Sequence, residues 1–246
     1  MNAASVRVFP DATGVSAALA QTFAESAQTA VAQHGSFEVA LSGGTTPKAA
    51  YLLLAAEPLR SQIDWSNVFV YFGDERCVPP DDAASNYRMA YESLLGAVPI
   101  PGENVFRMRG EADPAIAANE YASLIRARLG DHPHFDLVML GLGEDAHTAS
   151  LFPGSSLSMG DPSLVRAVYA TTQAMWRITL TPDAINGARG VVFAVEGAAK
   201  APALHSVLEG PRDVARWPAQ IVAPPHGTLT WLVDEAAAAD LNETMR

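Results

Sequence analysis

Cysteine is almost absent from this sequence, and the one thiol, Cys77, has no second cysteine in the chain with which to form a disulfide. A run of about 18 apolar residues, the length that a membrane-spanning helix needs, is also missing. Residues 1–7 lack the charged start and apolar core of a signal peptide. These absences predict a cytoplasmic protein that neither crosses a membrane nor depends on disulfides.

Lysine occurs only as Lys48 and Lys200, and the formal net charge at pH 7 is −11. Nucleic-acid surfaces need clustered basic residues, so the composition argues against a nucleic-acid partner. An anionic small molecule would therefore have to be bound locally, by backbone N–H groups and a few placed cations. Pairs such as Asp145 with His147 do not extend to the four-ligand spacing of a metal site. We expect no metal and no cofactor.

Apolar strand-like segments alternate with helical patterns along the chain, which predicts an α/β fold with a mainly parallel sheet. Segments 165–168 and 177–181 alternate between apolar and polar residues, so we expect a small antiparallel excursion there. No repeat, low-complexity segment or linker interrupts the pattern, so residues 1–246 are predicted to form a single domain. The remaining strands are expected at residues 6–9, 37–41, 68–72, 135–140, 190–195, 220–222 and 229–233, with a terminal helix from Asp234.

The strand expected at 37–41 runs into a glycine-rich turn, Ser42-Gly43-Gly44-Thr45-Thr46-Pro47-Lys48. Two glycines let the backbone turn tightly and approach a ligand, and Thr45 or Thr46 can cap the helix that follows. A helix N-terminus presents free N–H groups and partial positive charge, which suits an anion. The spacing fits neither G-x-x-x-x-G-K-[ST] nor G-x-G-x-x-G, so a dinucleotide is disfavoured. A phosphate site and an ordinary capped connection both remain open.

Charged residues also gather at other strand ends. The strand expected at 68–72 is followed by Gly73-Asp74-Glu75-Arg76, a cluster that can hold hydroxyls and stabilise developing negative charge, or else form a salt-bridged turn. Arg177 begins one expected strand and Lys200 follows another. The two can converge on a phosphate, the arginine as a fork and the lysine as a point charge, although most such side chains are solvated surface groups.

The clearest candidate site is the segment 141–150 (GLGEDAHTAS), which follows the apolar run 135–140. A buried parallel strand that empties into a glycine-rich turn with an acid and an imidazole is typical of a site at the carboxyl edge of a sheet. Histidine titrates near neutrality, so His147 suits the role of a general base, with Asp145 orienting it or holding a hydroxyl. A loop histidine at a helix start is the alternative.

Taken in order, these clusters resemble the 6-phosphogluconolactonases, which share a larger group with the glucosamine-6-phosphate deaminases and are related in fold to the ribose-5-phosphate isomerases. The resemblance spans nearly the whole chain and implies a Rossmann-like, twisted sheet with helices on both faces. One position departs from the family, because Ala146 stands where the family has the glycine of Asp-Gly-His. The matching pieces are 41–47 (LSGGTTP), 73–79 (GDERCVP), 85–87 (SNY), 141–154 (GLGEDAHTASLFPG) and 177–181 (RITLT).

The resemblance implies hydrolysis of 6-phospho-D-glucono-1,5-lactone to 6-phosphogluconate, the second step of the oxidative pentose phosphate pathway, by a monomer or weak homo-oligomer. It assigns the general base to His147 and supporting catalytic roles to Asp145 and Arg76. The residues that it assigns to phosphate binding are Ser42, Gly43, Gly44, Thr45, Arg177 and Lys200. From the charged cluster, we add Asp74 as a residue that binds substrate.

Two other functions are weighed against this one. An amino-sugar-phosphate deaminase or isomerase would resemble the same group, but that branch has a glutamate five residues after the histidine, and here the position is Phe152. A non-catalytic sugar-phosphate-binding protein would keep the phosphate loop, but would not need Asp145 and His147. Both features favour the lactonase.

Overall fold

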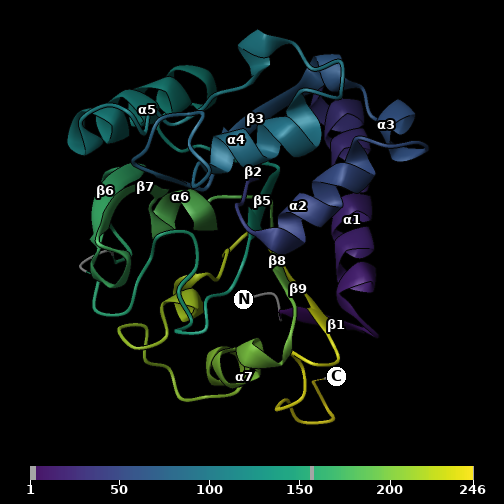
Figure 1. Ribbon diagram of the computed structural model, residues 1–246, viewed down its shortest axis with the longest axis vertical. Helices are drawn as coiled ribbons and strands as arrows, with labels where there is room; N and C mark the ends of the chain where they lie inside the picture. The colour runs from purple at the N-terminus through teal and green to yellow at the C-terminus, as the bar shows by residue number, and fades with distance from the viewer. Residues whose placement is uncertain (1–3, 156–157, 246) are drawn as a thin grey trace.

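Six parallel strands form the centre of the fold, in the order β1-β9-β8-β5-β2-β3 (Figure 1). The computed structural model describes residues 4–155 and 158–245. The strands β2, β5 and β8 are buried along their whole length because helices cover both faces of the sheet. The strand bounds are β1 Ser5–Phe9, β2 Phe37–Leu41, β3 Val68–Phe72, β5 Leu137–Leu140, β8 Gly190–Val195 and β9 Thr228–Asp234.

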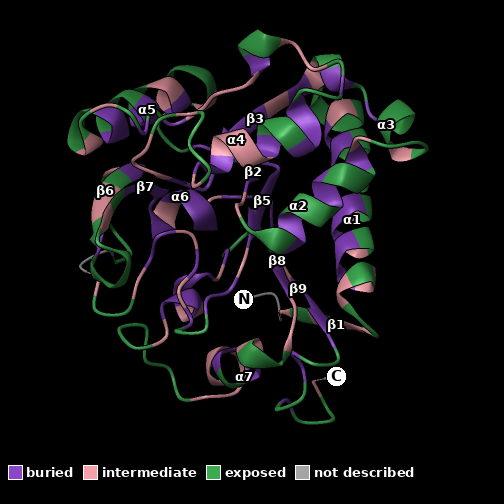
Figure 2. Cartoon of the chain, in the orientation of Figure 1, coloured by how far each residue is buried: buried purple, intermediate pink, exposed green. Residues whose placement is uncertain are grey.

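Helices pack on each face of this sheet and form two apolar cores. One core includes side chains of α1, α2, the end of α4 and the π-helical turn that follows α4. The other core includes side chains of α5, α6 and α7. Figure 2 shows the longer helices striped, with buried residues toward the sheet and exposed residues outward, as amphipathic surface helices should be. The helix bounds are α1 Ala12–His34, α2 Thr45–Leu54, α3 Leu59–Gln62, α4 Asn86–Ala90, α5 Pro114–Leu129, α6 Pro182–Asn186 and α7 Ala201–Leu208, with the π-helix η2 at Tyr91–Leu95.

A separate antiparallel sheet stands beside the main one, in the order β4-β7-β6. It confirms the predicted excursion, since β6 is Val165–Ala170 and β7 is Met175–Leu180. The third strand, β4 (Asp74–Arg76), was not expected as a strand, because the sequence shows only a charged cluster there. Pairing of β4 with β7 brings two distant charged segments into register. The α/β class with a mainly parallel sheet and helices on both faces is confirmed.

Two local predictions near the carboxyl end are wrong. Of the segment expected as a strand at 220–222, the first two residues lie in the 3-10 helix η6 (Pro218–Ile221), which begins at a proline, and Val222 follows as its C-cap. The helix expected from Asp234 is only a series of turns. Asp234 instead ends β9, and its carboxylate accepts hydrogen bonds from the backbone N–H of Gly197 and Ala237. The remaining short 3-10 turns are η1 Trp65–Asn67, η3 Gly102–Asn104, η4 Thr171–Gln173 and η5 Ala198–Lys200.

Candidate active site

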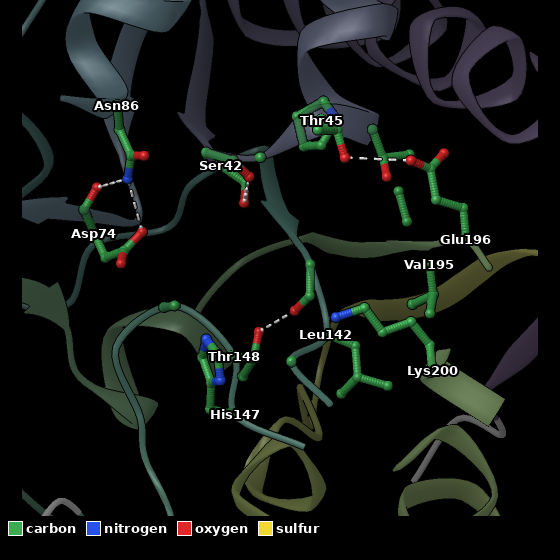
Figure 3. A pocket seen from close by; sticks show the side chains of 18 of the residues that line it. Ser42, Thr45, Asp74, Asn86, Leu142, His147, Thr148, Val195, Glu196 and Lys200 are labelled. Carbon is green, nitrogen blue, oxygen red and sulfur yellow. Dashed lines mark hydrogen bonds between the residues drawn. The ribbon is translucent and has the colours of Figure 1, made fainter. Parts of the chain in front are cut away.

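The carboxyl ends of four adjacent strands, β8, β5, β2 and β3, lead into loops that surround one cavity of about 360 Å³. A crevice at this edge is where open α/β sheets bind ligands. Figure 3 shows Ser42 and Thr45 above the cavity and His147 and Lys200 below it. Of the residues predicted for the site, all but Asp145 line this cavity, namely Ser42, Gly43, Gly44, Thr45, Asp74, Arg76, His147, Arg177 and Lys200.

The turn after β2 presents the start of α2 to the cavity. The prediction that Thr45 or Thr46 caps this helix is wrong, since the N-cap is Gly44, with φ of 113°, and no side chain caps it. The first backbone N–H groups of α2 are therefore left for a ligand. The buried Tyr51 fixes the backbone of the turn at Ser42. Its hydroxyl accepts a hydrogen bond from the Ser42 N–H at 3.1 Å and donates one to the Ser42 carbonyl at 2.9 Å.

Gly43 is required at this turn by close packing rather than by its backbone angles. A Cβ on residue 43 would lie 1.9 Å from Oδ1 of Asn86, which is itself buried. The Asn86 amide is held in place by hydrogen bonds from its Nδ2 to the carbonyl and to Oδ1 of Asp74, at 2.9 and 3.1 Å. Asn86 thus packs against the turn and joins it to the charged strand β4.

A buried carboxylate organises the wall formed by the antiparallel sheet. Oδ2 of Asp74 accepts a hydrogen bond from the Ser150 hydroxyl at 2.7 Å and lies 3.4 Å from Nη1 of Arg177. Burial lowers the pKa of the Arg177 guanidinium, with Asp74 opposing that effect and Arg76 adding to it. Arg177 also donates from Nη2 to Oε1 of Gln173. Asp74 therefore positions this cation at the cavity.

Arg76 and Arg177 face the same cavity from neighbouring strands. The Arg76 side chain is held by a hydrogen bond from Nη1 to the Ala84 carbonyl at 2.7 Å. The Nε atoms of both arginines are buried and have no hydrogen-bond partner among the described residues. Two guanidinium groups that line one cavity suit an anionic acceptor such as a carboxylate, a phosphate or an oxyanion.

Glu75 has a structural role. Its carboxylate accepts hydrogen bonds from the Ser85 hydroxyl and from the backbone N–H of Arg76, Asn86 and Tyr87, at 2.7 to 3.0 Å. Burial raises the pKa of this carboxyl, and the four donors oppose the rise. Of the two neighbouring acids, Asp74 alone faces the cavity, and Glu75 holds the start of α4 against β4.

Asp145 and His147 form a hydrogen-bonded pair beside the cavity. Nδ1 of His147 lies 2.5 Å from Oδ1 of Asp145, and the His147 backbone N–H also donates to that oxygen at 3.1 Å. Burial raises the pKa of Asp145, but the hydrogen bonds and the charge of His147 outweigh it and lower the pKa overall. The ring of Phe152 packs on the imidazole, with 4.9 Å between the two ring centroids. The imidazole is thus held by Nδ1, and its Nε2 is left for a ligand.

The backbone around His147 is tightly folded. A Cβ on Gly143 would lie 2.1 Å from Nδ1 of His147, so a side chain there would displace the imidazole. Ala146 has φ of 61° and is fully buried, which means that the position occupied by glycine in the family does adopt the left-handed region. Thr148 closes the loop with a hydrogen bond from its hydroxyl to the Gly141 carbonyl at 2.9 Å.

Among the lining residues with polar side chains, Asn86, Gln173 and Glu196 were given no role at the site by the sequence. Asn86 belongs to the matching piece 85–87, which was otherwise interpreted as a helix start, and Ser85 is indeed the N-cap of α4. Gln173 gives no signal in the sequence. Glu196 directly follows β8, so the rule that selected Asp74, a charged residue just after a buried strand, could have found it. Lys200 reaches the cavity from the same loop.

The described residues contain neither a cluster of metal ligands nor a membrane-spanning helix. Within 4–155 and 158–245, no three His, Cys, Asp or Glu side chains gather as metal ligands would. No helix in those ranges combines the length and apolar character needed to cross a bilayer.

Residues 10–231 match the family model described as glucosamine-6-phosphate isomerases/6-phosphogluconolactonase. The chain belongs to this family. Among curated relatives, the 6-phosphogluconolactonase of Nostoc sp. is 38% identical over 97% of this chain and 98% of its own length. The 6-phosphogluconolactonase of Synechocystis sp. is 40% identical over 86% of this chain and 88% of its own length. The resemblance inferred from the sequence is confirmed.

Solved structures agree with this membership. The 6-phosphogluconolactonase from Trypanosoma brucei superposes with a TM-score of 0.87 at 30% identity, covering 98% of this chain and 99% of that one. A monomeric glucosamine-6-phosphate deaminase superposes with a TM-score of 0.84 at 20% identity, covering 96% of this chain and 99% of that one. That likeness concerns the fold alone, so it leaves the choice between the two activities to the site.

Proposed function

We propose that this chain hydrolyses 6-phospho-D-glucono-1,5-lactone to 6-phospho-D-gluconate, the second step of the oxidative pentose phosphate pathway. The observation that carries the proposal is the sharing of one cavity by two features. The imidazole of His147, held through Nδ1 by Asp145, borders the same space as the uncapped start of α2 at Gly44. A small molecule with a phosphate at one end and a reactive carbonyl at the other suits that arrangement.

The phosphate would lie against the turn 42–45, with Lys200 as a point charge from the facing loop and Arg177 as a further cation. This anchor is remote from the reacting carbonyl, so its binding energy can be used to hold the lactone in the orientation for attack. The net charge of −11 makes such a local anchor necessary, because the protein as a whole repels a phosphate ester.

In the chemical step, Nε2 of His147 would take a proton from a water molecule as the water oxygen attacks C1 of the lactone. The C1 carbonyl oxygen becomes an oxyanion, which Arg76 is placed to stabilise. Collapse of this intermediate breaks the bond between C1 and the ring oxygen, and protonated His147 returns its proton to that oxygen. The product is the open-chain acid, which ionises to the carboxylate. Asp145 keeps the ring oriented through its hydrogen bond with Nδ1.

Two observations favour this function over the two alternatives, a deaminase or isomerase and a non-catalytic binding protein. Phe152 packs on the His147 ring, where the deaminase branch is expected to place a glutamate, so the ring-opening acid of that chemistry is missing. The intact Asp145–His147 pair argues against a protein that only binds sugar phosphates.

The deciding experiment compares two reactions on the purified protein. Acid release from freshly prepared 6-phospho-D-glucono-1,5-lactone is measured against the spontaneous rate in buffer, and ammonia release is measured from glucosamine 6-phosphate. We expect acceleration of the first reaction alone. Ammonia release without lactone hydrolysis would assign the protein to the deaminases, and tight binding of 6-phosphogluconate with neither reaction would identify it as a binding protein.

A further inference from the structure

Glu196 places a carboxylate at the end of the cavity where the phosphate is proposed to bind. The residue follows β8, lines the cavity and is half-buried. Its Oε1 accepts a hydrogen bond from the Thr45 hydroxyl at 3.3 Å, as the dashed line in Figure 3 shows. Thr45 is the first residue of α2, so this carboxylate lies beside the uncapped N-terminus of that helix.

The loop that carries Glu196 is held in place by hydrogen bonds to the end of β9. The next residue, Gly197, has φ of 90°, and its backbone N–H donates to both carboxylate oxygens of Asp234, each at 3.0 Å. That anchor ties the loop to the end of β9 and directs residue 196 toward α2. Glu196 therefore occupies its position because of the fold around it.

The charge of Glu196 is not neutralised by a neighbour. No Lys, Arg or His among the described residues lies within ion-pair distance of it, including Lys200 in the same loop. In the free protein the carboxylate complements the partial positive charge at the start of α2. A bound phosphate would use that same positive end, and would then lie beside an unpaired negative charge.

We propose that Glu196 competes electrostatically with the ligand phosphate and limits how tightly phosphate-bearing molecules bind. The inference rests on the proposed function, because it takes the turn at Thr45 as the phosphate anchor. Two like charges a few ångströms apart in a partly solvated site repel measurably, and a phosphate dianion doubles the effect. Substrate and product carry the same phosphate, so the repulsion weakens binding of both and favours release of the product.

The test uses inorganic phosphate as the probe, with Glu196→Gln as the variant. Glutamine keeps an oxygen that can accept the Thr45 hydrogen bond and removes only the charge. The matched control is Glu103→Gln, an equal change of net charge at an exposed position that does not line the cavity. Calorimetric titration at low ionic strength gives the Kd of each protein, and a second titration at high salt reports how much of the difference is electrostatic.

We expect Glu196→Gln to bind phosphate about 3- to 30-fold more tightly than the wild type at low salt, and by a smaller factor at high salt because the repulsion is screened. Glu103→Gln should bind as the wild type does.

Equal or weaker binding by Glu196→Gln would overturn the inference and leave the proposed function intact, since Glu196 would then be neutral or a ligand-contacting acceptor. Absence of phosphate binding in all three proteins would overturn the inference together with the proposed anchor. Phosphate binding without any lactone hydrolysis would remove the proposed function alone.

Discussion

Arg76 and Arg177 lie directly opposite each other across the antiparallel pair of β4 and β7. Like charges in directly opposed positions on a sheet destabilise it. The next pair on the same face of the two strands, Asp74 and Thr179, supplies one carboxylate, and its oxygen lies 3.4 Å from Nη1 of Arg177. One acid therefore offsets part of the charge of two guanidiniums, and the remaining positive charge faces the cavity.

This arrangement predicts that Arg76 serves the reaction more than it serves folding. We expect Arg76→Gln to lower kcat/KM by about 10²- to 10³-fold, the usual effect of removing a group that stabilises an oxyanion. Its stability to urea should change little, because relief of the contact with Arg177 offsets loss of the hydrogen bond to Ala84. Arg60→Gln, at an exposed position, is the control. Unchanged kcat/KM in Arg76→Gln would rule out its role at the oxyanion.

The assignment of His147 predicts a large loss of turnover on its removal. His147→Ala should lower kcat about 10²- to 10⁴-fold, the range expected for loss of a general base. Circular dichroism should show an intact fold, because the imidazole lies at the cavity and outside the apolar cores. His226→Ala removes an exposed imidazole elsewhere and should leave kcat unchanged. Wild-type turnover in His147→Ala would assign the base to another group.

The close approach of Gly143 to the imidazole of His147 predicts an effect of one added methyl group. Because a Cβ there would lie 2.1 Å from Nδ1 of His147, Gly143→Ala should push the imidazole away from Asp145 and lower kcat by about 10²-fold. Gly102→Ala is the control, since nothing lies within 4 Å of the added Cβ. A crystal structure of Gly143→Ala with the Asp145–His147 hydrogen bond unaltered would contradict this explanation.

The left-handed backbone of Ala146 predicts unusual tolerance of glycine. Glycine removes steric strain of about 1 kcal/mol at φ of 61°, and it loses a buried methyl group of about 0.8 kcal/mol. We therefore expect Ala146→Gly to change the free energy of unfolding by less than about 1 kcal/mol. Ala117→Gly, at an equally buried position inside α5, should cost about 1 to 2 kcal/mol. Urea denaturation of both variants measures the contrast, and equal losses would show that the backbone at 146 is unstrained.

An acid-sensitive contribution to stability is expected from Glu111. Arg107 donates two hydrogen bonds to its carboxylate, at 2.8 and 2.7 Å, and lowers the pKa of Glu111 to about 2 from an ordinary value of 4.5. A depressed pKa stabilises the fold above the unfolded-state pKa, and that stability is lost as pH falls from 4.5 toward 2. Both side chains are about 30% exposed, so solvent screening reduces the contribution to about 1 kcal/mol.

Urea denaturation of the wild type and Glu111→Gln tests this at two pH values. At pH 7 the variant should be less stable by about 1 kcal/mol, and the difference should shrink steadily as the pH is lowered below about 4.5. Glu92→Gln, in the more exposed pair with Arg88, should show a smaller difference at pH 7. A difference between wild type and Glu111→Gln that does not depend on pH would mean that the hydrogen bonds to Arg107 act through packing instead of charge.

Much of this site was accessible from the order of residues along the chain. The apolar run 37–41 is the buried strand β2, and the run 135–140 contains the buried strand β5. The polar residues that follow these strands lie at one edge of the sheet. The link between strand, glycine turn and polar cluster is local, so the turn at Ser42 and the pair Asp145 and His147 could be recognised without coordinates. The failures at 220–222 and after Asp234 are also local, since short segments carry too few residues for a periodic pattern to decide.

What the sequence by itself determined was the composition of the site: which residues follow buried strands, and therefore which chemistry reaches the sheet edge. Only the tertiary structure decided how those residues face one another. Arg76 lies opposite Arg177, and Glu196 contacts Thr45, although each pair is distant in the chain. Asp74 and Glu75 are adjacent in the chain but lie on opposite faces of β4. The physical reason is that strand pairing and burial choose the partners of a charged group, and neither is encoded by its immediate neighbours.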